Sequence, residues 1–469
     1  MRWRRRTSGP RGRSGRTRAF RRLVAVTAVT VGSVTAVTAA FGGTAAAAGG
    51  ADLALVAGSA SGHASAGSAG GYAFAEDARR VDGADGTADA TPLEAGVTYR
   101  SSLARDARAY YGLELDAASD AYVSVTAVPR PGEEVVAVDG VRVSVQDADG
   151  GSCSLDSATF GAARSPRPVT AWGAREITRT GTRCQDPGRY YVVVERVRPQ
   201  DSPPDAWDLE LTTVSEPAVK GTAATDAPQT WDSASPAPLT GEPENRPGGA
   251  GFADAASIGP GAWRADAEPG QTLYYKVPLD WGRQLYATAE LGGADGRSGY
   301  ATGALSLSLL NPVRGQVDSA GTGYTGRRAT VDLGPVPPVA YGNRYAVAEE
   351  QSAMRFAGSY YLVVHLAEQV ADRFGDGPFE VVLRVRLTGA ERTGPDYAGE
   401  PVPRGVFEAT EPLRAAASDD AAGSEAGSGA GDGAADPAMR AVAVGGIGTG
   451  SVLLAGLGVW TVVARRRGA

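Results

Sequence analysis

Histidine and cysteine, the side chains that most often transfer protons, attack as nucleophiles or bind zinc, are scarce in this chain. The 469 residues contain two of each. His63 lies in a Gly/Ala/Ser-rich stretch that would not hold a general base in place, and His365 ends a Tyr-rich apolar run. A Ser-His-Asp or Cys-His hydrolase needs a fixed base, and a His-based zinc site needs several ligands. We therefore expect no catalytic residue, no metal site and no cofactor, and we interpret His365 as a polar residue at a strand end.

Carboxylates are plentiful, with 53 Asp and Glu residues, but no pair is marked out as the acid and base of a glycoside hydrolase. Asp116 and Asp280 each follow an alternating apolar run, which favours a turn-capping role. The run Asp147-Ala-Asp-Gly-Gly151 has the spaced carboxylates of a calcium loop but lacks its distal Glu. A hairpin turn is the simpler interpretation, and calcium binding at 147–151 stays open.

The elements that would position such residues occur twice. A run that starts at Tyr274 matches a run that starts at Tyr110 without a gap, at an offset of 164 residues, and later runs match at offsets of 170 and 172. Strands keep their pattern while the connecting loops absorb insertions, as loops generally can. The chain is therefore an internal duplication.

Within each copy, apolar residues alternate with other residues, as in 141–145 and 305–309. Period two with many β-branched and aromatic residues, broken by Gly, Pro and Asp, is typical of antiparallel strands. We predict an all-β protein with two tandem β-sandwich, jelly-roll-like domains at 91–215 and 254–393, each of about seven or eight strands.

The two cysteines lie in the first copy. Cys153 aligns with Val317, and Cys184 aligns with Met354, so both are replaced together in the second copy. Residues in contact would change in this way. Outside the cytoplasm we expect a Cys153–Cys184 disulfide; two free thiols or a metal site are the alternatives.

Four adjacent tyrosine pairs fall in predicted strands; they begin at Tyr110, Tyr190, Tyr274 and Tyr360. Because side chains alternate along a strand, one ring of each pair must point inward and the other outward. The outward rings either bind a glycan or protein partner or become buried, in part between the copies, and burial is favoured.

The repeated run is followed by a turn that differs between the copies, where Trp281-Gly-Arg283 replaces Ala-Ala-Ser. Exposed aromatic and arginine side chains are common at binding surfaces. We therefore interpret Trp281, Arg283 and Tyr286 as candidate contact residues.

Both ends of the chain have the pattern of membrane-directed segments. Residues 1–48 combine ten arginines, an uncharged run at 23–40 and Ala-x-Ala motifs, which predicts a signal peptide for general secretion; an uncleaved anchor is the alternative. Residues 441–464 carry no charge and precede three arginines, which predicts one transmembrane helix with 465–469 in the cytoplasm and the remainder outside. Gly446 and Gly450 form a GxxxG motif that allows weak self-association.

The remaining segments are low in complexity. We expect a disordered arm at 49–90, a Pro/Thr/Ser-rich linker at 216–253 and a flexible acidic stalk at 394–440. Without the thirteen arginines at the two ends, the chain holds 33 basic and 53 acidic residues. Such an acidic body repels phosphate backbones, so we expect no nucleic-acid partner.

The run Tyr274-Tyr-Lys-Val-Pro-Leu279, a strand that ends in a turn at 147–150, and Pro187-Gly-Arg-Tyr-Tyr-Val resemble the bacterial pre-peptidase C-terminal domain. The resemblance covers both copies and implies exported β-sandwiches that serve as accessory or binding modules. The layout also resembles membrane-anchored surface proteins of high-GC Gram-positive bacteria. It departs from the usual arrangement of the family because no catalytic domain precedes the modules.

We therefore expect a non-catalytic, membrane-anchored extracellular protein that acts as a structural, adhesive or partner-binding accessory module. Its partner would be an extracellular protein or a cell-wall glycan. Two alternatives stay open: a signalling or assembly subunit that pairs through its transmembrane helix, and a hydrolase or protease-associated module.

Overall fold

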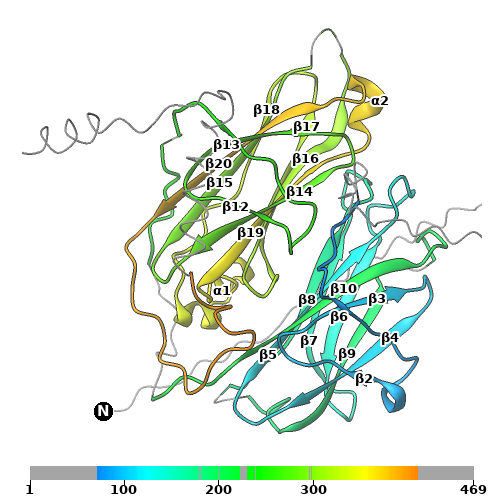
Figure 1. Ribbon diagram of the computed structural model, residues 1–469, viewed down its shortest axis with the longest axis vertical. Coiled ribbons are helices and arrows are strands. Elements are labelled where there is room, and N and C mark those ends of the chain that lie inside the picture. The colour runs from blue at the N-terminus through cyan, green and yellow to red at the C-terminus, as the bar shows by residue number, and fades with distance from the viewer. Residues whose placement is uncertain are drawn as a thin grey trace, which may run out of the picture. The chain divides into compact units, whose positions relative to one another are not determined.

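The computed structural model of the chain describes residues 71–178, 181–198, 200–221, 230–237, 239–294, 296 and 298–409. All of them belong to one compact unit, residues 65–469. Within them the protein is all-β, with two sandwich-like domains (Figure 1). The predicted signal peptide, transmembrane helix and tail, with His63, Gly446 and Gly450, lie outside the described residues. None of the helices in the described ranges has the length and hydropathy to cross a membrane.

Among the described residues, the first copy comprises ten strands. They are β1 (Arg79–Arg80), β2 (Thr91–Pro92), β3 (Thr98–Leu103), β4 (Arg108–Leu115), β5 (Asp120–Val128), β6 (Gly140–Gln146), β7 (Ser152–Thr159), β8 (Val169–Arg175), β9 (Gly188–Arg196) and β10 (Trp207–Glu216). A short 3-10 helix, η1 (Thr87–Asp89), precedes β2.

The second copy has the same number of strands. They are β11 (Glu244–Asn245), β12 (Ala256–Ser257), β13 (Gly261–Ala267), β14 (Thr272–Leu279), β15 (Gln284–Leu291), β16 (Ala301–Leu310), β17 (Gln316–Tyr324), β18 (Ala329–Asp332), β19 (Gly358–Leu366) and β20 (Phe379–Thr388). Its short helices are η2 (Tyr341–Tyr345), α1 (Glu349–Ser352) and α2 (Val370–Phe374).

The strand order confirms the duplication. The first copy pairs its strands as β1-β3-β10-β5-β8 and β2-β4-β9-β6-β7. The second copy repeats this order as β11-β13-β20-β15-β18 and β12-β14-β19-β16-β17. The long strands pair antiparallel, as predicted, whereas the two-residue strands pair parallel to their neighbours. Each copy reaches ten strands because two of them are these short edge segments, which the sequence pattern is too brief to mark.

The two cores follow the predicted alternation. Val141, Val143 and Val145 are fully buried on β6, and Leu305, Leu307 and Leu309 are fully buried on β16. Their burial supplies the main driving force of folding.

The low-complexity flanks contribute more structure than the sequence predicts. Residues 71–90 of the expected arm carry β1 and η1, residues 244–253 of the expected linker carry β11, and residues 394–409 of the expected stalk pair with 215–219. Each flank carries an aromatic ring that packs against the sandwiches: Tyr72, which is half-buried, and Phe252 and Phe407, which are buried. Burial of these rings offsets the entropy lost on ordering the backbone.

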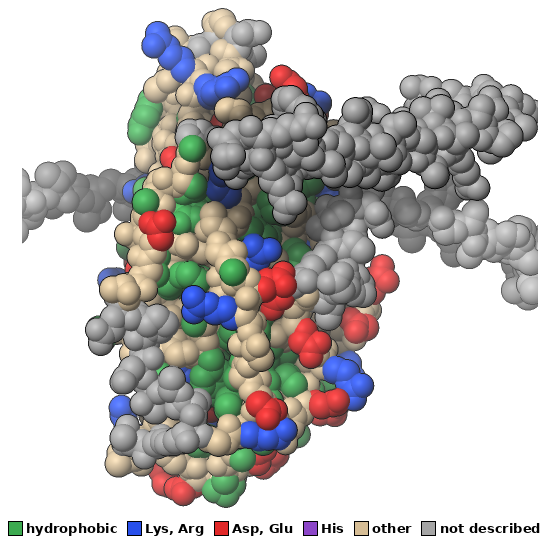
Figure 2. Space-filling view, turned by 90° about the vertical axis from the view of Figure 1, so that its left-hand side faces the viewer, with side chains coloured by type: hydrophobic (Ala, Val, Ile, Leu, Met, Phe, Trp, Pro, Cys, Tyr) green, Lys and Arg blue, Asp and Glu red, His purple; other side chains and the backbone are tan. Residues whose placement is uncertain are grey.

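Charged side chains of both signs are interspersed on the outside of the described region, as one face shows (Figure 2). Many of their ion pairs are solvated. In the Arg79–Glu94 pair, for example, the side chains are 59% and 67% exposed. Such pairs contribute only about 0 to 1 kcal/mol each. The ion pairs between the two copies lie in a different environment.

Candidate functional site

The tyrosine pairs divide as the alternation predicts. Tyr111 and Tyr190 belong to the first core, and Tyr275 and Tyr360 belong to the second. The outward Tyr274 is nevertheless buried, because Tyr72 and Phe252 pack edge-on against its ring at 5.8 and 5.0 Å between centroids. Phe252 also covers the outward Tyr361 at 4.9 Å. The outward rings of the second copy are therefore covered by the chain itself.

The same aromatic cluster contains the first polar link between the copies. Arg314, in the turn between β16 and β17, places Nη1 2.6 Å from Glu210 Oε1 on β10 of the first copy. The Glu210 side chain is completely buried. Its oxygens also accept hydrogen bonds from the Tyr72 hydroxyl at 2.9 Å and the Ala75 amide at 3.1 Å. Both oxygens of a buried carboxylate are thus satisfied, which such a group requires.

A second link lies at the end of β10. Arg344 of η2 pairs with Glu216 at 2.7 Å and with Asp120 at 3.3 Å. The hydroxyls of Tyr122 and Tyr397 each donate to Glu216 at 2.8 Å. Burial, reinforced by the nearby negative charge of Glu216, raises the pKa of Asp120 to about 7.

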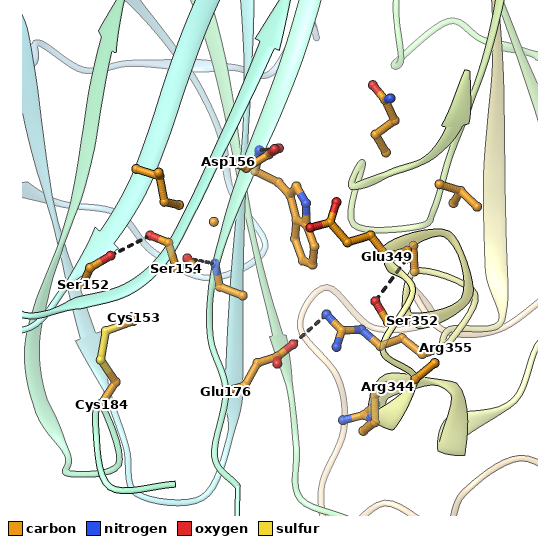
Figure 3. A pocket seen from close by; sticks show the side chains of 18 of the residues that line it. Ser152, Cys153, Ser154, Asp156, Glu176, Cys184, Arg344, Glu349, Ser352 and Arg355 are labelled. Carbon is orange, nitrogen blue, oxygen red and sulfur yellow. Dashed lines mark hydrogen bonds and ion pairs between the residues drawn. A yellow bond between two sulfur atoms is a disulfide. The ribbon is translucent and has the colours of Figure 1, made fainter. Parts of the chain in front are cut away.

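A third link joins Arg355 to Glu176, which follows β8, at 2.6 Å (Figure 3). The Arg355 guanidinium lies over the rings of Tyr122, Trp172 and Phe356 at 5.2 to 5.6 Å from their centroids. The Arg355 side chain is 6% exposed and that of Glu176 is 33% exposed, so the rings shield the guanidinium while the carboxylate still meets solvent.

His365 provides a fourth link. It is buried within β19, where its Nδ1 lies 3.0 Å from Thr272 Oγ1 and its Nε2 lies 2.9 Å from Ser165 Oγ of the first copy. Ser165 is also fully buried and accepts a hydrogen bond from the Glu368 amide at 3.0 Å. Burial, with the positive charge of Arg167, holds the pKa of His365 well below its usual range. This Ser–His pair has Thr in place of a carboxylate and no exposed hydroxyl, so it joins the copies rather than presenting a nucleophile.

The links are asymmetric. The carboxylates come from the first copy and the arginines from the second. At the offset of 172 residues, Glu210 aligns with Val382 and Glu216 aligns with Thr388. The sequence did not reveal the links, because Arg344 and Arg355 lie where the offset changes and have no obvious counterpart. The detectable signal was the pair of acids on the outward face of β10.

A cleft of about 980 Å³ runs along the seam between the copies. Figure 3 shows β7 and β8 of the first copy on one side and the α1 region of the second copy on the other. A second cleft of about 640 Å³ adjoins it, between the 157–170 segment and the outer face of β16 and β17. Ser157, Ala158, Thr170, Gln316 and Ser319 line both clefts, so the two form one continuous groove.

Three edge strands border this groove, namely β7, β8 and β17. On β8, the amides of Trp172 and Ala174 donate to Asp156 Oδ2 at 3.1 Å and to Ser154 Oγ at 2.7 Å. Two side chains of β7 therefore accept hydrogen bonds from the amides at the edge of β8. The outer edges of β7 and β17 have no neighbouring strand among the described residues.

The predicted disulfide is confirmed. Cys153 of β7 bonds to Cys184 with an S–S distance of 2.08 Å. Both cysteines line the larger cleft (Figure 3). The bond ties the segment before β9 to the edge strand that forms the cleft wall.

The predicted contact residues lie elsewhere. Trp281 is only 9% exposed and belongs to the second core, with its indole against Gly394. Arg283 donates to Gly389 O at 2.8 Å and pairs with Glu391 at 3.6 Å, while Tyr286 is half-buried on β15. None of the three lines the groove. Their role in binding stays a prediction, and the burial of Trp281 leaves little of its ring for a partner.

The predicted turn carboxylates act locally. Asp116 Oδ1 accepts from the amides of Ala118 and Ser119, and Asp147 Oδ1 accepts from those of Asp149 and Gly151. These bonds are typical of Asx-type turns. Within the described ranges, no group of three or more His, Cys, Asp or Glu side chains is placed to hold a metal ion.

No family model matches the chain, and no curated protein matches it. Among solved structures, the N-terminal CBM22-1–CBM22-2 tandem domain of Paenibacillus barcinonensis Xyn10C is 11% identical, covering 70% of this chain and 100% of its own, with a TM-score of 0.17. Tripeptidyl peptidase 2 is 7% identical, covering 65% of this chain and 24% of its own, with a TM-score of 0.19. The M60 catalytic domain with CBM51-1 and CBM51-2 of Clostridium perfringens ZmpB is 11% identical, with coverages of 61% and 34% and a TM-score of 0.15. These are remote similarities between β domains, and they identify no family.

Proposed function

We propose that this chain is an exported, membrane-anchored accessory protein without catalytic activity of its own, and that the groove between its two copies binds its partner. One observation carries the proposal. The walls of the groove come from different copies, and ion pairs of three arginines, two of them with the buried carboxylates Glu210 and Glu216, hold those copies together. A binding site built across two rigidly joined domains keeps its shape before the partner arrives, which lowers the entropic cost of binding.

The chemistry of the walls favours an extended polar partner. Ser152, Ser154, Gln316 and Ser319 offer hydroxyl and amide groups along the groove. A protein segment or a cell-wall glycan chain presents the complementary donors and acceptors along its length.

Features of the sequence support a location outside the cytoplasm. The resemblance to pre-peptidase C-terminal domains implies an accessory module outside the cytoplasm. The signal peptide at 1–48 and the helix at 441–464, both predictions from the sequence, would display the two copies on the cell surface.

A blocking substitution tests the proposal. Ser319 is an exposed residue on edge strand β17 and lines both clefts, so Ser319→Trp fills the groove. Thr330→Trp, at an exposed position of edge strand β18 in the same copy, is the matched control. We expect envelope proteins or cell-wall fragments captured by the wild type to be retained by Thr330→Trp and lost with Ser319→Trp. Equal capture by both variants would refute the groove as the binding site.

A further inference from the structure

Arg167 lies in the loop between β7 and β8 and lines the smaller cleft. Its Nη1 donates to Phe160 O at 2.6 Å and its Nη2 donates to Thr159 O at 3.3 Å. These two carbonyl groups hold the guanidinium at the end of edge strand β7. A guanidinium has five N–H donors, so most of its capacity is left for other partners.

Arg167 has no acidic partner in the described part of the chain. No carboxylate oxygen there lies within 4.0 Å of its guanidinium. The three arginines that link the copies, Arg314, Arg344 and Arg355, each have a carboxylate within 2.7 Å. Burial lowers the pKa of Arg167 to about 10, since no nearby anion compensates for the loss of water. A cation is thus held in the cleft of an otherwise acidic body.

The opposite wall offers free hydroxyl groups. Ser306 and Ser308 project from β16 into the same cleft, and neither hydroxyl has a hydrogen-bond partner among the residues that the structure describes. Ser306 lies directly opposite His365 in the β16–β19 register, and His365 is close enough to Arg167 for its titration to respond to the guanidinium charge. On β17, Gly321 lines the cleft beside these serines and leaves room for a ligand backbone, whereas the Tyr300 ring packs against Gly323.

The backbone of β7 adds a third feature. Phe160 N donates to Asp139 O at 3.1 Å, so residues of the same parity, such as Ala158, face β6. Because the pattern alternates in an antiparallel pair, Ser157 and Leu155 direct their N–H and C=O groups to the open edge. An open strand edge is a template for an extended peptide.

We propose that the smaller cleft binds an extended peptide segment of a partner protein, which adds to the edge of β7 and places a carboxylate on Arg167. The inference rests on the proposed function and names the partner class for the same groove. The guanidinium supplies the charge-assisted bonds, the hydroxyls of Ser306 and Ser308 supply further donors, and the strand edge supplies backbone pairing.

The test uses the full-length chain in detergent micelles and fluorescein-labelled acetyl-Ser-Val-Ser-Glu-Ser-Val-Ser-amide, read by fluorescence anisotropy. The same peptide with Gln in place of Glu is the neutral control. We expect the Glu peptide to bind about tenfold more tightly, since hydrogen bonds to charged groups are stronger than neutral ones. Arg167→Met should remove this preference, whereas Arg183→Met, an exposed arginine of the larger cleft, should retain it.

A second variant guards against misfolding of Arg167→Met. Ser306→Asp places a carboxylate of the chain itself in the cleft, which should abolish the preference with the Arg167 loop intact. Failure of both peptides to bind, equal affinity for both, or a preference that survives Ser306→Asp would overturn the inference. Binding of tri-galacturonic acid without peptide binding would overturn the peptide assignment in favour of an acidic glycan. Each of these results can coexist with loss of partner capture by Ser319→Trp, so the inference and the proposed function fail separately.

Discussion

Glu216 and Arg344 lie 128 residues apart in the sequence, yet Glu216 Oε1 and Arg344 Nη2 are 2.7 Å apart in the fold. Their side chains are only 1% and 8% exposed. The pair joins a strand end of the first copy to a segment of the second copy. The proposed binding groove therefore needs this pair and its neighbours to keep the two copies in place.

Removing one partner of the pair should uncouple the copies. Arg344→Met leaves the Glu216 and Asp120 carboxylates buried without their cation, so we expect a loss of about 3 to 5 kcal/mol in the free energy of unfolding. Denaturant unfolding should then show two transitions in place of one coupled transition.

The matched control is Arg404→Met. Arg404 pairs with Glu400 at the surface, where the two side chains are 80% and 68% exposed. Its loss should change stability by no more than about 1 kcal/mol. A similar small effect of Arg344→Met would show that the buried pair does not hold the copies together.

Asp120 lies where the two copies meet and should make the free energy of unfolding depend on pH. Its pKa in the fold is about 7, above the ordinary value, because of burial first and Glu216 second, with Glu176 adding and Arg344 opposing. A raised carboxyl pKa stabilises the fold at low pH, and this contribution is lost as the pH rises through about 7. Relative to Asp120→Asn, the wild type should lose on the order of 2 kcal/mol between pH 5 and pH 8.

The comparison with Asp120→Asn cancels the contribution of His365, which both proteins share. The lowered pKa of His365 acts in the opposite direction, because its stabilising effect is lost as the pH falls below the ordinary histidine value. A stability difference between wild type and variant that is constant from pH 5 to pH 8 would contradict the assignment of Asp120. The measurement is urea unfolding at a series of pH values.

The sequence predicted the sandwiches because their cores are periodic. The alternation of Leu305, Leu307 and Leu309 predicts a strand with one buried face. The repeated tyrosine pairs indicate the duplication. The disulfide could be inferred because Cys153 and Cys184 are both absent from the second copy.

The groove could not be predicted in the same way. It depends on contacts such as Glu210 with Arg314 and Ser165 with His365, which join residues 104 and 200 positions apart. Neither member of such a pair carries a periodic or local signal. His365 lies next to the end of β19, as its sequence predicts, but the sequence does not predict its contact with Ser165 of the first copy.

The order of the flanking segments could not be predicted from the sequence either. Tyr72 and Phe407 lie in segments whose composition indicates disorder, and single aromatic residues are too few to change a compositional average. Their packing depends on surfaces formed by distant strands.

Loss of the disulfide should affect the first copy. In the chain-entropy picture, Cys153→Ala with Cys184→Ala should lower its stability by about 3 to 4 kcal/mol, given a sequence separation of 31 residues. Calorimetry of the double variant should show the coupled transition of the two copies at a lower temperature. If the double variant melts like the wild type, the disulfide contributes little to stability.

Trp281 should behave as a core residue. Trp281→Ala removes a largely buried indole, and we expect a loss of about 3 to 5 kcal/mol in the stability of the second copy. Thermal unfolding followed by circular dichroism measures this loss. Unchanged stability with impaired partner binding would instead support the sequence-based interpretation of Trp281 as a contact residue.

The groove between the copies should contact the partner in intact cells, which photo-crosslinking can measure. A photoreactive amino acid is introduced at Ser319, which lines both clefts, and separately at Thr330, which lines neither. We expect a discrete crosslinked product from position 319 and none from position 330. Crosslinking from position 330 with none from position 319 would contradict this expectation.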